Sequence, residues 1–461
     1  MDDSLRETIT ALLEPRNVAV IGASRDPESV GHGVLLSLLQ GCMLGNACKP
    51  FKGRIFPVNP NADEILGVKC FSSVKDVPGE VDCAVIAVPA AIVPRVAREC
   101  CEKKVKALVV ISAGFGEIGN RELEREVAGI AREGGARLLG PNCLGVLRPS
   151  KNYNASFAPA APPAGDVAFV TQSGALADSE IDVALKERYS FSAIVSLGNS
   201  ADLDAADFVE WLGEDAETKS IALYLEGVRD GRKLLKAIKE CGKPVVFLKG
   251  GRSAEGSQAA ASHTGSLAGA PKVFDAALKQ AGAVNAESFE ELFDAAKALA
   301  QQPRLKQNSV VVVTNGGGAG VLCVDYCKQF GVELAELKAS TIERLDKGGK
   351  MHSAYSRRNP LDLVGDALPE RYEAALNVLL QEDYVHGLIV VQTLQTMTNP
   401  LEDARIVVEA RKRFPQKPAV CVFMGGKFTK QSVDFLRKNG VPDFNDPRKA
   451  VRVMAALAGV L

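Results

Sequence analysis

The chain has 461 residues, which is enough for about three domains at roughly 150 residues each. Its 55 Lys and Arg residues nearly balance 56 Asp and Glu residues, and the formal net charge of −1 argues against nucleic acid as a partner. No apolar run reaches the roughly 18 residues that a membrane span needs, so we expect no membrane association and a cytoplasmic location. The 11 cysteines form no four-ligand zinc pattern, which predicts reduced thiols and no metal site.

Short apolar, β-branched runs alternate with helical patterns along the whole chain. This alternation predicts parallel sheets built from βαβ units and places the fold in the α/β class. The first five runs predict a doubly wound domain over residues 1–150, with strands at 17–22, 54–58, 82–88, 106–112 and 137–140. Residues 154–165 are rich in Ala and Pro and suit an extended connection better than a helix or strand, so we place the first boundary there.

Two further sets of apolar runs predict two more domains of the same class. The second domain is expected over residues 160–300, with strands at 166–171, 191–197, 220–225 and 244–249. The third is expected over residues 308–461, with strands at 309–314, 387–392 and 418–423. Residues 301–308 separate the two sets.

The second and third sets resemble two copies of one repeat. Residues 170–175 (VTQSGA) are similar to 313–319 (VTNGGGA), and 243–251 (KPVVFLKGG) are similar to 417–426 (KPAVCVFMGG). After Gly251 the first copy continues into a small-residue segment that holds His263, whereas the second copy continues into a charged helical pattern at 428–438. We interpret this difference as chemistry added to one copy of a shared scaffold.

The first predicted strand runs into a glycine-rich turn, Gly22 to Gly33, followed by a helix at 34–40. Such a turn places backbone N–H groups and the positive end of a helix dipole where a phosphate can bind. The spacing is not G-x-G-x-x-G, which disfavours a nicotinamide dehydrogenase and favours another phosphate-bearing ligand. Candidate ligand-binding residues in this turn and at the neighbouring strand ends are Gly22, Ser24, Arg25, Asn59, Pro60, Pro89, Ser112 and Ala113. For Ser24 and Arg25, the alternative is a turn stabilised by Asp26 and Pro27.

A second candidate anion site follows the strand at 166–171. Ser173, Gly174 and Ala175 begin a predicted helix, where Gly174 permits close backbone approach; an ordinary serine N-cap is the alternative for Ser173. Asn142, in the tight turn 140–145, offers a donor and an acceptor.

His263 and Glu226 are the candidate catalytic residues. His263 lies among small residues that suit a loop approaching a ligand, and imidazole acts as a nucleophile near neutral pH; the alternative is a histidine that only hydrogen-bonds its neighbours. Glu226 follows the strand at 220–225, so its carboxylate can orient one imidazole nitrogen and leave the other free. An exposed charge in a turn is the alternative for Glu226.

Seven motifs together, over nearly the whole chain, resemble the alpha subunit of ADP-forming acetyl-CoA synthetase, in the succinyl-CoA synthetase superfamily. They are residues 20–24 (VIGAS), 58–61 (VNPN), 140–145 (GPNCLG), 171–174 (TQSG), 224–227 (YLEG), 262–265 (SHTG) and 314–318 (TNGGG). The resemblance implies a CoA-binding Rossmann-like domain followed by two flavodoxin-like domains.

The resemblance also implies a role for each candidate residue. His263 becomes phosphorylated, and Glu226 steadies the phosphohistidine. The helix start at Ser173 and Gly174 holds phosphate with help from the Asn142 turn, while Ser24, Arg25 and the first domain's strand ends hold coenzyme A.

In such enzymes phosphate attacks the acyl-CoA thioester to give acyl phosphate and free CoA. His263 then takes the phosphoryl group, the organic acid leaves, and ADP becomes ATP. No segment resembles an ATP-grasp domain, so we expect a separate beta subunit that carries ADP/ATP and Mg²⁺, in an α2β2 assembly. The alternatives are a non-catalytic CoA-binding regulatory or scaffold subunit, a protein acetyltransferase component, and a nicotinamide dehydrogenase. The sequence leaves the identity of the organic acid open.

Overall fold

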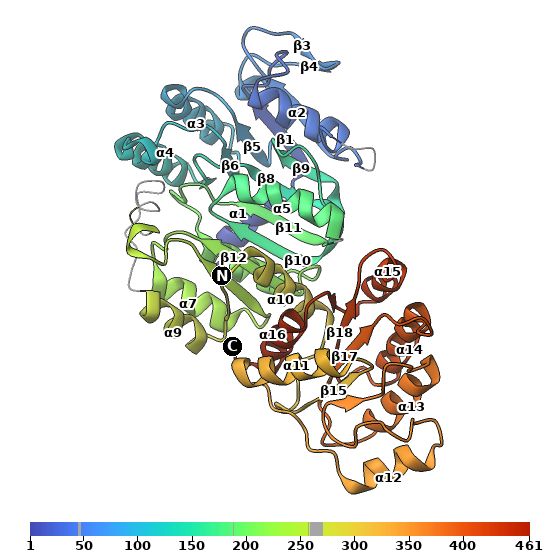
Figure 1. Ribbon diagram of the computed structural model, residues 1–461. Helices are drawn as coiled ribbons and strands as arrows, with labels where there is room; N and C mark the ends of the chain where they lie inside the picture. The colour runs from blue at the N-terminus through green and yellow to red at the C-terminus, as the bar shows by residue number, and fades with distance from the viewer. Residues whose placement is uncertain (45–47, 188, 257, 259–270) are drawn as a thin grey trace. The chain divides into compact units, whose positions relative to one another are not determined.

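The computed structural model describes residues 1–44, 48–187, 189–256, 258 and 271–461. The chain divides into two compact units, Met1–Ser288 and Phe289–Leu461. The described part contains three main sheets, dominated by parallel pairing and flanked by helices (Figure 1). The prediction of an α/β fold with doubly wound parallel sheets is therefore confirmed.

The first sheet has the strand order β2-β1-β5-β6-β7, and all its pairs are parallel. The order reverses between β1 and β5, so a crevice for a ligand is expected beyond the carboxyl ends of these two strands. The strands are β1 Asn17–Ile21, β2 Arg54–Val58, β5 Cys83–Ile86, β6 Ala107–Val110 and β7 Arg137–Leu139, and a hairpin of β3 Glu64–Ile65 and β4 Val68–Lys69 follows β2. The helices of this part are α1 Asp3–Leu13, α2 Val30–Gln40, α3 Val93–Glu102 and α4 Arg121–Glu133.

The second sheet, also in the first unit, has the order β14-β13-β12-β10-β11-β8-β9. Its parallel strands are β10 Ala164–Thr171, β11 Phe191–Ser196, β12 Ser220–Leu225, β13 Val245–Lys249 and β14 Val284–Ala286. Its helices are α5 Gly174–Glu187, α6 Ala205–Glu214, α7 Gly231–Glu240 and α9 Pro271–Gln280. The antiparallel strands β8 Gly145–Arg148 and β9 Tyr153–Ser156 extend it.

The expectation that residues 154–165 form only an extended connection was wrong at both ends, since Ala164 and Gly165 begin β10. Asn154, Ala155 and Ser156 belong to β9 and pair with β8, which in turn pairs with β11. The polar side chains are buried and bonded, since Asn154 donates to the carbonyl of Gly41 at 3.1 Å and Ser156 donates to Asn154 at 2.6 Å. A strand of this composition lacks the apolar signal on which the prediction relied.

The second unit contains the sheet β16-β15-β17-β18-β19, in which every pair is parallel. Its strands are β15 Val310–Thr314, β16 Leu361–Asp362, β17 Gly387–Thr393, β18 Ala419–Met424 and β19 Asp443–Phe444. Its helices are α10 Phe289–Gln301, α11 Gly317–Phe330, α12 Ala339–Lys347, α13 Pro369–Leu379, α14 Pro400–Arg413, α15 Lys430–Lys438 and α16 Pro447–Ala458.

The internal repeat is confirmed by topology and by side-chain bonds. Numbered in chain order, the parallel strands of the second and third sheets both have the order 2-1-3-4-5, which is the flavodoxin-like order. Thr171 and Thr314 each accept a hydrogen bond from a backbone N–H two residues later, at 3.0 and 2.9 Å. Lys243 and Lys417, which begin the matching Lys-Pro segments, each donate to two backbone carbonyls near the end of an earlier helix.

Ion pairs to one buried carboxylate join the first two sheets. Asp202, just after β11, has a fully buried side chain and accepts from Arg132 at 2.6 Å and Arg137 at 2.8 Å. These arginines hold the pKa of the Asp202 carboxyl below its usual value, although burial opposes the shift. The segment that follows β11 is thereby fixed against helix α4 and strand β7.

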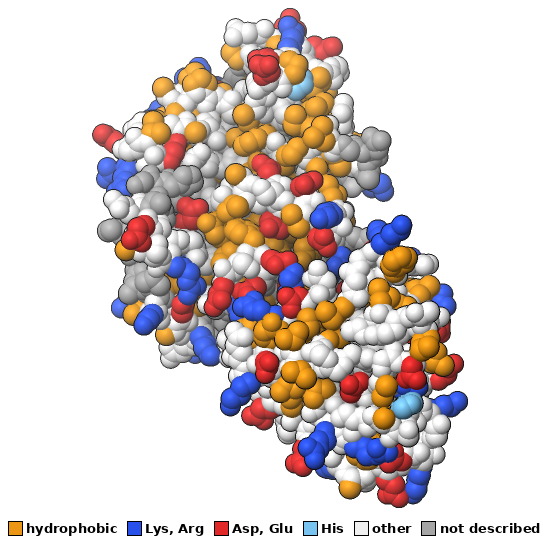
Figure 2. All heavy atoms as spheres, in the orientation of Figure 1, with side chains coloured by type: hydrophobic (Ala, Val, Ile, Leu, Met, Phe, Trp, Pro, Cys, Tyr) orange, Lys and Arg blue, Asp and Glu red, His pale blue; other side chains and the backbone are white. Residues whose placement is uncertain are grey.

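The surface carries both charge signs. On the face drawn in Figure 2, Lys and Arg side chains are interspersed with Asp and Glu in both units. Among the helices that the structure describes, none combines the length and apolar character that crossing a bilayer demands.

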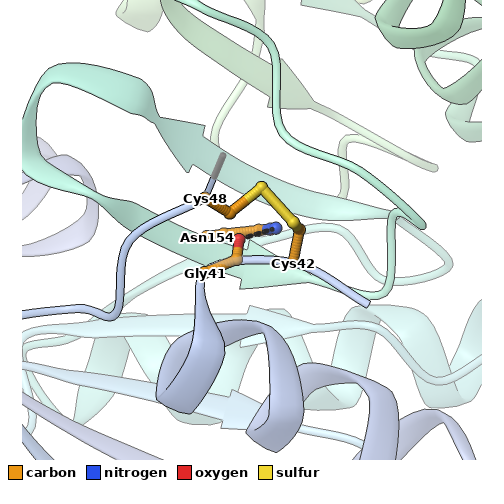
Figure 3. The surroundings of a disulfide bond; sticks show 4 residues. All are labelled: Gly41, Cys42, Cys48 and Asn154. Carbon is orange, nitrogen blue, oxygen red and sulfur yellow. Dashed lines mark hydrogen bonds between the residues drawn. A yellow bond between two sulfur atoms is a disulfide. The ribbon is translucent and has the colours of Figure 1, made fainter. Parts of the chain in front are cut away.

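The expectation that every cysteine is a free thiol was wrong for one pair. Cys42 and Cys48 form a disulfide whose Cα atoms lie 5.8 Å apart, at the C-terminal end of α2 (Figure 3). The two cysteines are six residues apart in the sequence, and their Cα separation lies within the usual range for a disulfide. Asn154 donates to the carbonyl of Gly41 beside the disulfide, which ties the end of α2 to β9.

Asp403 is a buried carboxyl in the first turn of α14. It is completely buried, and neither carboxyl oxygen has a hydrogen-bond partner among the described residues. Burial raises its pKa to about 7, and the nearby Glu402 and Glu370 act in the same direction. The folded chain therefore keeps this proton up to near pH 7, whereas the unfolded chain releases it near its usual pKa of 3.8.

Because the folded-state pKa is raised, stability is lost as the pH rises from about 4 to about 7. Asp403→Asn keeps the neutral shape, so we expect it to stabilise the second unit more at pH 8 than at pH 5, by roughly 1–3 kcal/mol. Hydrogen exchange of α14 peptides measures this unit directly, since the single tryptophan, Trp211, lies in the first unit. The exposed Asp325→Asn on α11 is the control; equal gains for Asp403→Asn at both pH values would contradict the assignment.

Candidate active site

The first predicted ligand edge is built by close backbone approach. Gly22 has a φ of +93°, and a Cβ there would lie 2.3 Å from the carbonyl oxygen of Ala87. A Cβ on Gly31 would lie 1.9 Å from the carbonyl oxygen of Gly22. Both positions therefore require glycine, and together they press the first turn of α2 against the end of β1.

Ser24, Arg25 and Asn59 lie around this turn, and each has a bond within the chain. The Ser24 hydroxyl accepts from the N–H of Asp26 at 3.0 Å, and Asn59 donates to the carbonyl of Ala23 at 2.8 Å. Arg25 is exposed and donates through Nε to the carbonyl of Glu64 at 3.0 Å. The turn-stabilising alternative thus describes the Ser24 hydroxyl, while Arg25 presents its remaining guanidinium donors to solvent.

The neighbouring strand ends lie at the same edge. Pro60, Pro89 and Ala113 are exposed after β2, β5 and β6. Ser112 donates from its hydroxyl to the carbonyl of Val88 at 2.5 Å, and its own carbonyl accepts from the N–H of Asn142 at 3.0 Å. The first turn of α2 contains no acidic side chain, so its dipole and Arg25 favour an anionic ligand here.

The second predicted ligand edge is the start of α5. The Ser173 hydroxyl accepts from the N–H of Leu176 at 3.4 Å, which is the geometry of an N-cap. Gly174 faces Leu144, because an added Cβ would lie 3.2 Å from the Leu144 Cβ atom, and Ala175 is exposed. The first turn of α5 has no acidic residue. The turn 140–145 and this helix start are therefore adjacent. The partial positive charge at the N-terminus of α5 suits an anion.

The Asn142 side chain bonds a residue outside the predicted phosphate site. Asn142 has a φ of +58° and donates through Nδ2 to the side-chain oxygen of Asn199 at 3.2 Å. Asn199 in turn donates to Glu117 at 2.6 Å and Glu124 at 2.7 Å. The Asn142 amide therefore belongs to a network with two carboxylates, and it is Leu144 of the same turn that contacts the start of α5.

Glu226 follows β12 and is only partly buried. The side-chain oxygen of Gln172, at the end of the adjacent strand β10, accepts from the N–H of Glu226 at 2.6 Å and from that of Gly227 at 2.9 Å. The Tyr224 hydroxyl donates to the Glu226 carboxylate at 3.4 Å. Gln172 thus fixes the backbone that carries Glu226 directly beside the start of α5.

Lys249 fixes the same turn from the other side. It is the last residue of β13 and only 7% exposed, and its ammonium donates to the carbonyl of Glu226 at 2.6 Å and to that of Gly250 at 2.5 Å. Burial lowers the pKa of this ammonium, and the charge of Glu226 opposes the shift. A Cβ on Gly250 would lie 3.2 Å from the Glu226 Cγ atom, so the chain leaves β13 in contact with Glu226.

His263, the predicted phosphorylated residue, lies outside the described residues. The described chain shows where its segment begins, because Gly250 and Gly251 leave β13 beside Glu226. Within the described ranges, no cluster of three His, Cys, Asp or Glu side chains could hold a metal ion. Burial raises the pKa of Cys143 to about 12, which removes that thiol as a nucleophile.

Sequence reasoning missed Gln172 and Lys249. Gln172 lies in the motif 171–174, but the predicted anion site was assigned to the serine and glycine that follow it. Lys249 carries a clearer signal, because a lysine that ends an apolar strand must find acceptors when it is buried. The carbonyls that it bonds cannot be identified from residue types.

Three family models match the chain: a CoA binding domain over residues 16–149, a succinyl-CoA ligase like flavodoxin domain over residues 164–299, and a Ligase-CoA domain over residues 310–458.

Two curated relatives and one solved structure are similar over nearly the whole chain. The alpha subunit of ADP-forming acetate–CoA ligase II from Pyrococcus furiosus is 42% identical over 452 residues, covering 96% of both chains. ADP-forming acetate–CoA ligase from Methanocaldococcus jannaschii is 42% identical over 96% of this chain, which spans 62% of that protein's length. The dinucleotide forming acetyl-coenzyme A synthetase 1 of Ca. Korarchaeum cryptofilum, in complex with phosphate and ADP, has a TM-score of 0.92 at 37% identity, covering 98% of this chain and 97% of that chain.

Gln172→Ala leaves the N–H groups of Glu226 and Gly227 without their acceptor. We expect faster hydrogen exchange in the peptide around Glu226 and a loss of roughly 1–3 kcal/mol in the stability of the first unit. Trp211 fluorescence during urea unfolding measures the stability, and Gln280→Ala on the exposed end of α9 is the matched control. Unchanged exchange around Glu226 would show that Gln172 does not hold this turn.

Proposed function

The chain belongs to the family of ADP-forming acetate–CoA ligase alpha subunits, and on this premise we propose that it converts acyl-CoA, phosphate and ADP into organic acid, CoA and ATP. A beta subunit completes the enzyme, and His263 carries the phosphoryl group from the acyl phosphate to ADP. The position of Glu226 is the observation that carries this proposal. Its carboxylate lies where the chain departs toward His263, and Gln172 and Lys249 hold its backbone from two adjacent strands.

The reaction proceeds by three displacements. A phosphate oxygen attacks the thioester carbonyl carbon, and the CoA thiolate leaves. An imidazole nitrogen of His263 then attacks phosphorus, and the organic carboxylate leaves. Finally, a terminal oxygen of ADP attacks the same phosphorus, and the imidazole is released as ATP forms. Glu226 accepts a hydrogen bond from the second imidazole nitrogen, which orients the ring and stabilises its positive charge.

The start of α5 supplies phosphate binding. The N–H groups of Gly174 and Ala175 stand at the positive end of the helix dipole, and no acidic residue in the first turn competes with the ligand. The Ser173 N–H donates to the Thr171 hydroxyl at 3.0 Å, so Ser173 contributes through its hydroxyl. The turn that contains Asn142 borders one side of this phosphate site, because Leu144 contacts the start of α5. Preorganised N–H donors of this kind stabilise negative charge on phosphate without moving during the reaction.

The glycine turn of the first sheet fits the phosphate-bearing part of CoA. Arg25 and the first turn of α2 favour anions, while Asn59, Pro60, Pro89, Ser112 and Ala113 line the neighbouring strand ends. Bound CoA supplies a thiol that carries the acyl group as a thioester. The three matched ranges also support the domain division at 1–150, 160–300 and 308–461, which stays a prediction.

The partner belongs to the same proposal. Relatives named as alpha subunits have nearly this length, whereas the M. jannaschii protein is longer than this chain. We propose an ATP-grasp beta subunit that holds ADP/ATP and Mg²⁺, an α2β2 assembly, and a cytoplasmic location.

Phosphate-dependent ATP formation from acetyl-CoA, measured with the beta subunit present, tests the proposal. We expect His263→Ala to lower kcat by at least about a thousandfold, because no other group takes the phosphoryl, and Glu226→Gln to lower it roughly 10- to 100-fold. The exposed Glu240→Gln on α7 is the matched control. CoA binding by each variant verifies folding. Undiminished turnover by His263→Ala would overturn the proposed mechanism.

A further inference from the structure

A groove of about 820 Å³ lies at the edge of the first sheet where the strands begin, away from their carboxyl ends. It is lined by four cationic residues, Arg16, Lys52, Arg54 and Lys151, and by one acidic residue, Glu14. The lining therefore carries an excess of three positive charges in a single concavity. The proposed CoA and phosphate sites lie at the carboxyl ends of the strands and include none of these residues.

Three of these cations have no partner among the described residues. Arg16, Lys52 and Arg54 are exposed, and neither a hydrogen bond nor an ion pair engages their side chains. Lys151 differs, because it lies 3.8 Å from Glu14 and 3.5 Å from Glu217. Glu14 is itself held by the buried Arg148 at 3.2 Å. Glu14 and Glu217 are thus committed to Lys151 and Arg148, which leaves three cationic side chains for a ligand.

The backbone that carries these cations is fixed. The N–H of Arg54 donates to the carbonyl of Arg16 at 2.8 Å, and a Cβ on Gly53 would lie 2.3 Å from that same oxygen. The Asp82 carboxylate accepts from the N–H groups of Arg16 and Asn17 at 2.8 and 2.9 Å. Arg16 and Arg54 therefore project from neighbouring strand starts at a set spacing, which reduces the ordering cost of binding.

Phe51 adds an apolar wall to the groove. Its ring centroid lies 5.1 Å from that of Tyr153, and its N–H donates to the carbonyl of Leu38 at 2.9 Å. The Cys42–Cys48 disulfide anchors the start of the same segment (Figure 3). An aromatic ring of a ligand can pack on the half-buried Phe51 ring, while the guanidinium and ammonium groups of the groove bind the ligand's phosphate oxygens.

We propose that this groove binds a small anion that carries two or more phosphates, supplied either as a nucleoside polyphosphate or as inorganic polyphosphate. A single phosphate group neutralises only part of the charge of three cations, whereas a di- or triphosphate carries enough negative charge to pair with all of them. The binding is electrostatic, so its affinity falls as salt concentration rises. The site is independent of the proposed catalytic function and of CoA.

Calorimetric titration of the full chain, saturated with CoA and free of Mg²⁺, tests the proposal with tripolyphosphate, ATP and AMP as probes. We expect ATP and tripolyphosphate to bind at least about tenfold more tightly than AMP, and Lys52→Ala/Arg54→Ala to weaken both at least about tenfold. Arg25→Ala, at the opposite edge, is the control that leaves this binding unchanged. Circular dichroism confirms that each variant is folded.

The Phe51→Leu variant distinguishes a nucleoside polyphosphate from inorganic polyphosphate as the ligand. Tighter binding of ATP than of tripolyphosphate, lost in Phe51→Leu, identifies a nucleotide site, and equal binding of both identifies a polyphosphate site. Probe binding that occurs in the CoA-free chain and disappears when CoA is saturating, sensitivity to Arg25→Ala without sensitivity to Lys52→Ala/Arg54→Ala, or no binding of any probe would each overturn the proposal. None of these results depends on turnover by His263.

Discussion

The candidate site depends on two hydrogen bonds, which the N–H groups of Glu226 and Gly227 donate to the side-chain oxygen of Gln172. Gln172 follows β10 and stands just before the start of α5, whereas Glu226 follows the neighbouring strand β12. One amide oxygen therefore fixes a carboxylate and an anion-binding helix start relative to each other. Lys249 extends the connection to β13, whose continuation leads toward His263. Three adjacent strands of a parallel sheet are thus locked together where ligands bind in this class of fold.

The internal repeat separates the scaffold from the chemistry. In the second copy, Asn315 takes the place of Gln172, because its side-chain oxygen accepts from the N–H of Thr393 at 2.7 Å. Thr393 therefore stands where Glu226 stands in the first copy, and the Lys-Pro starts bond helix ends in both. The scaffold bonds are kept, but the carboxylate and the histidine segment occur in one copy. In the proposed function, the added carboxylate and histidine segment give the first copy a role that the shared scaffold alone does not have.

The longer parallel strands were predictable because they are apolar runs that are buried on both faces, as at Val310–Thr314. The parallel strands β14, β16 and β19 were not predicted, because two or three residues that include a polar one give no apolar run. Strand β9 was not, since buried Asn154 and Ser156 give a polar pattern that only tertiary hydrogen bonds explain. In the site, Glu226 was predictable from its place after a strand. Gln172 and Lys249 were not, because both act on backbone groups distant in sequence. Two further contacts could not be predicted, because they depend on the folded geometry. They are the contact of Leu144 with the start of α5 and the Cys42–Cys48 disulfide.

The central claim is that Glu226 is held in place to receive a phosphorylated His263. The most direct measurement is peptide mapping of the complex of this chain with its beta subunit after incubation with ATP labelled at the terminal phosphate, under alkaline conditions that preserve phosphohistidine. The account predicts one acid-labile phosphate on the peptide that contains His263, with a lower yield in the Glu226→Gln variant. A label on another residue, or no label while ATP formation continues, would contradict it.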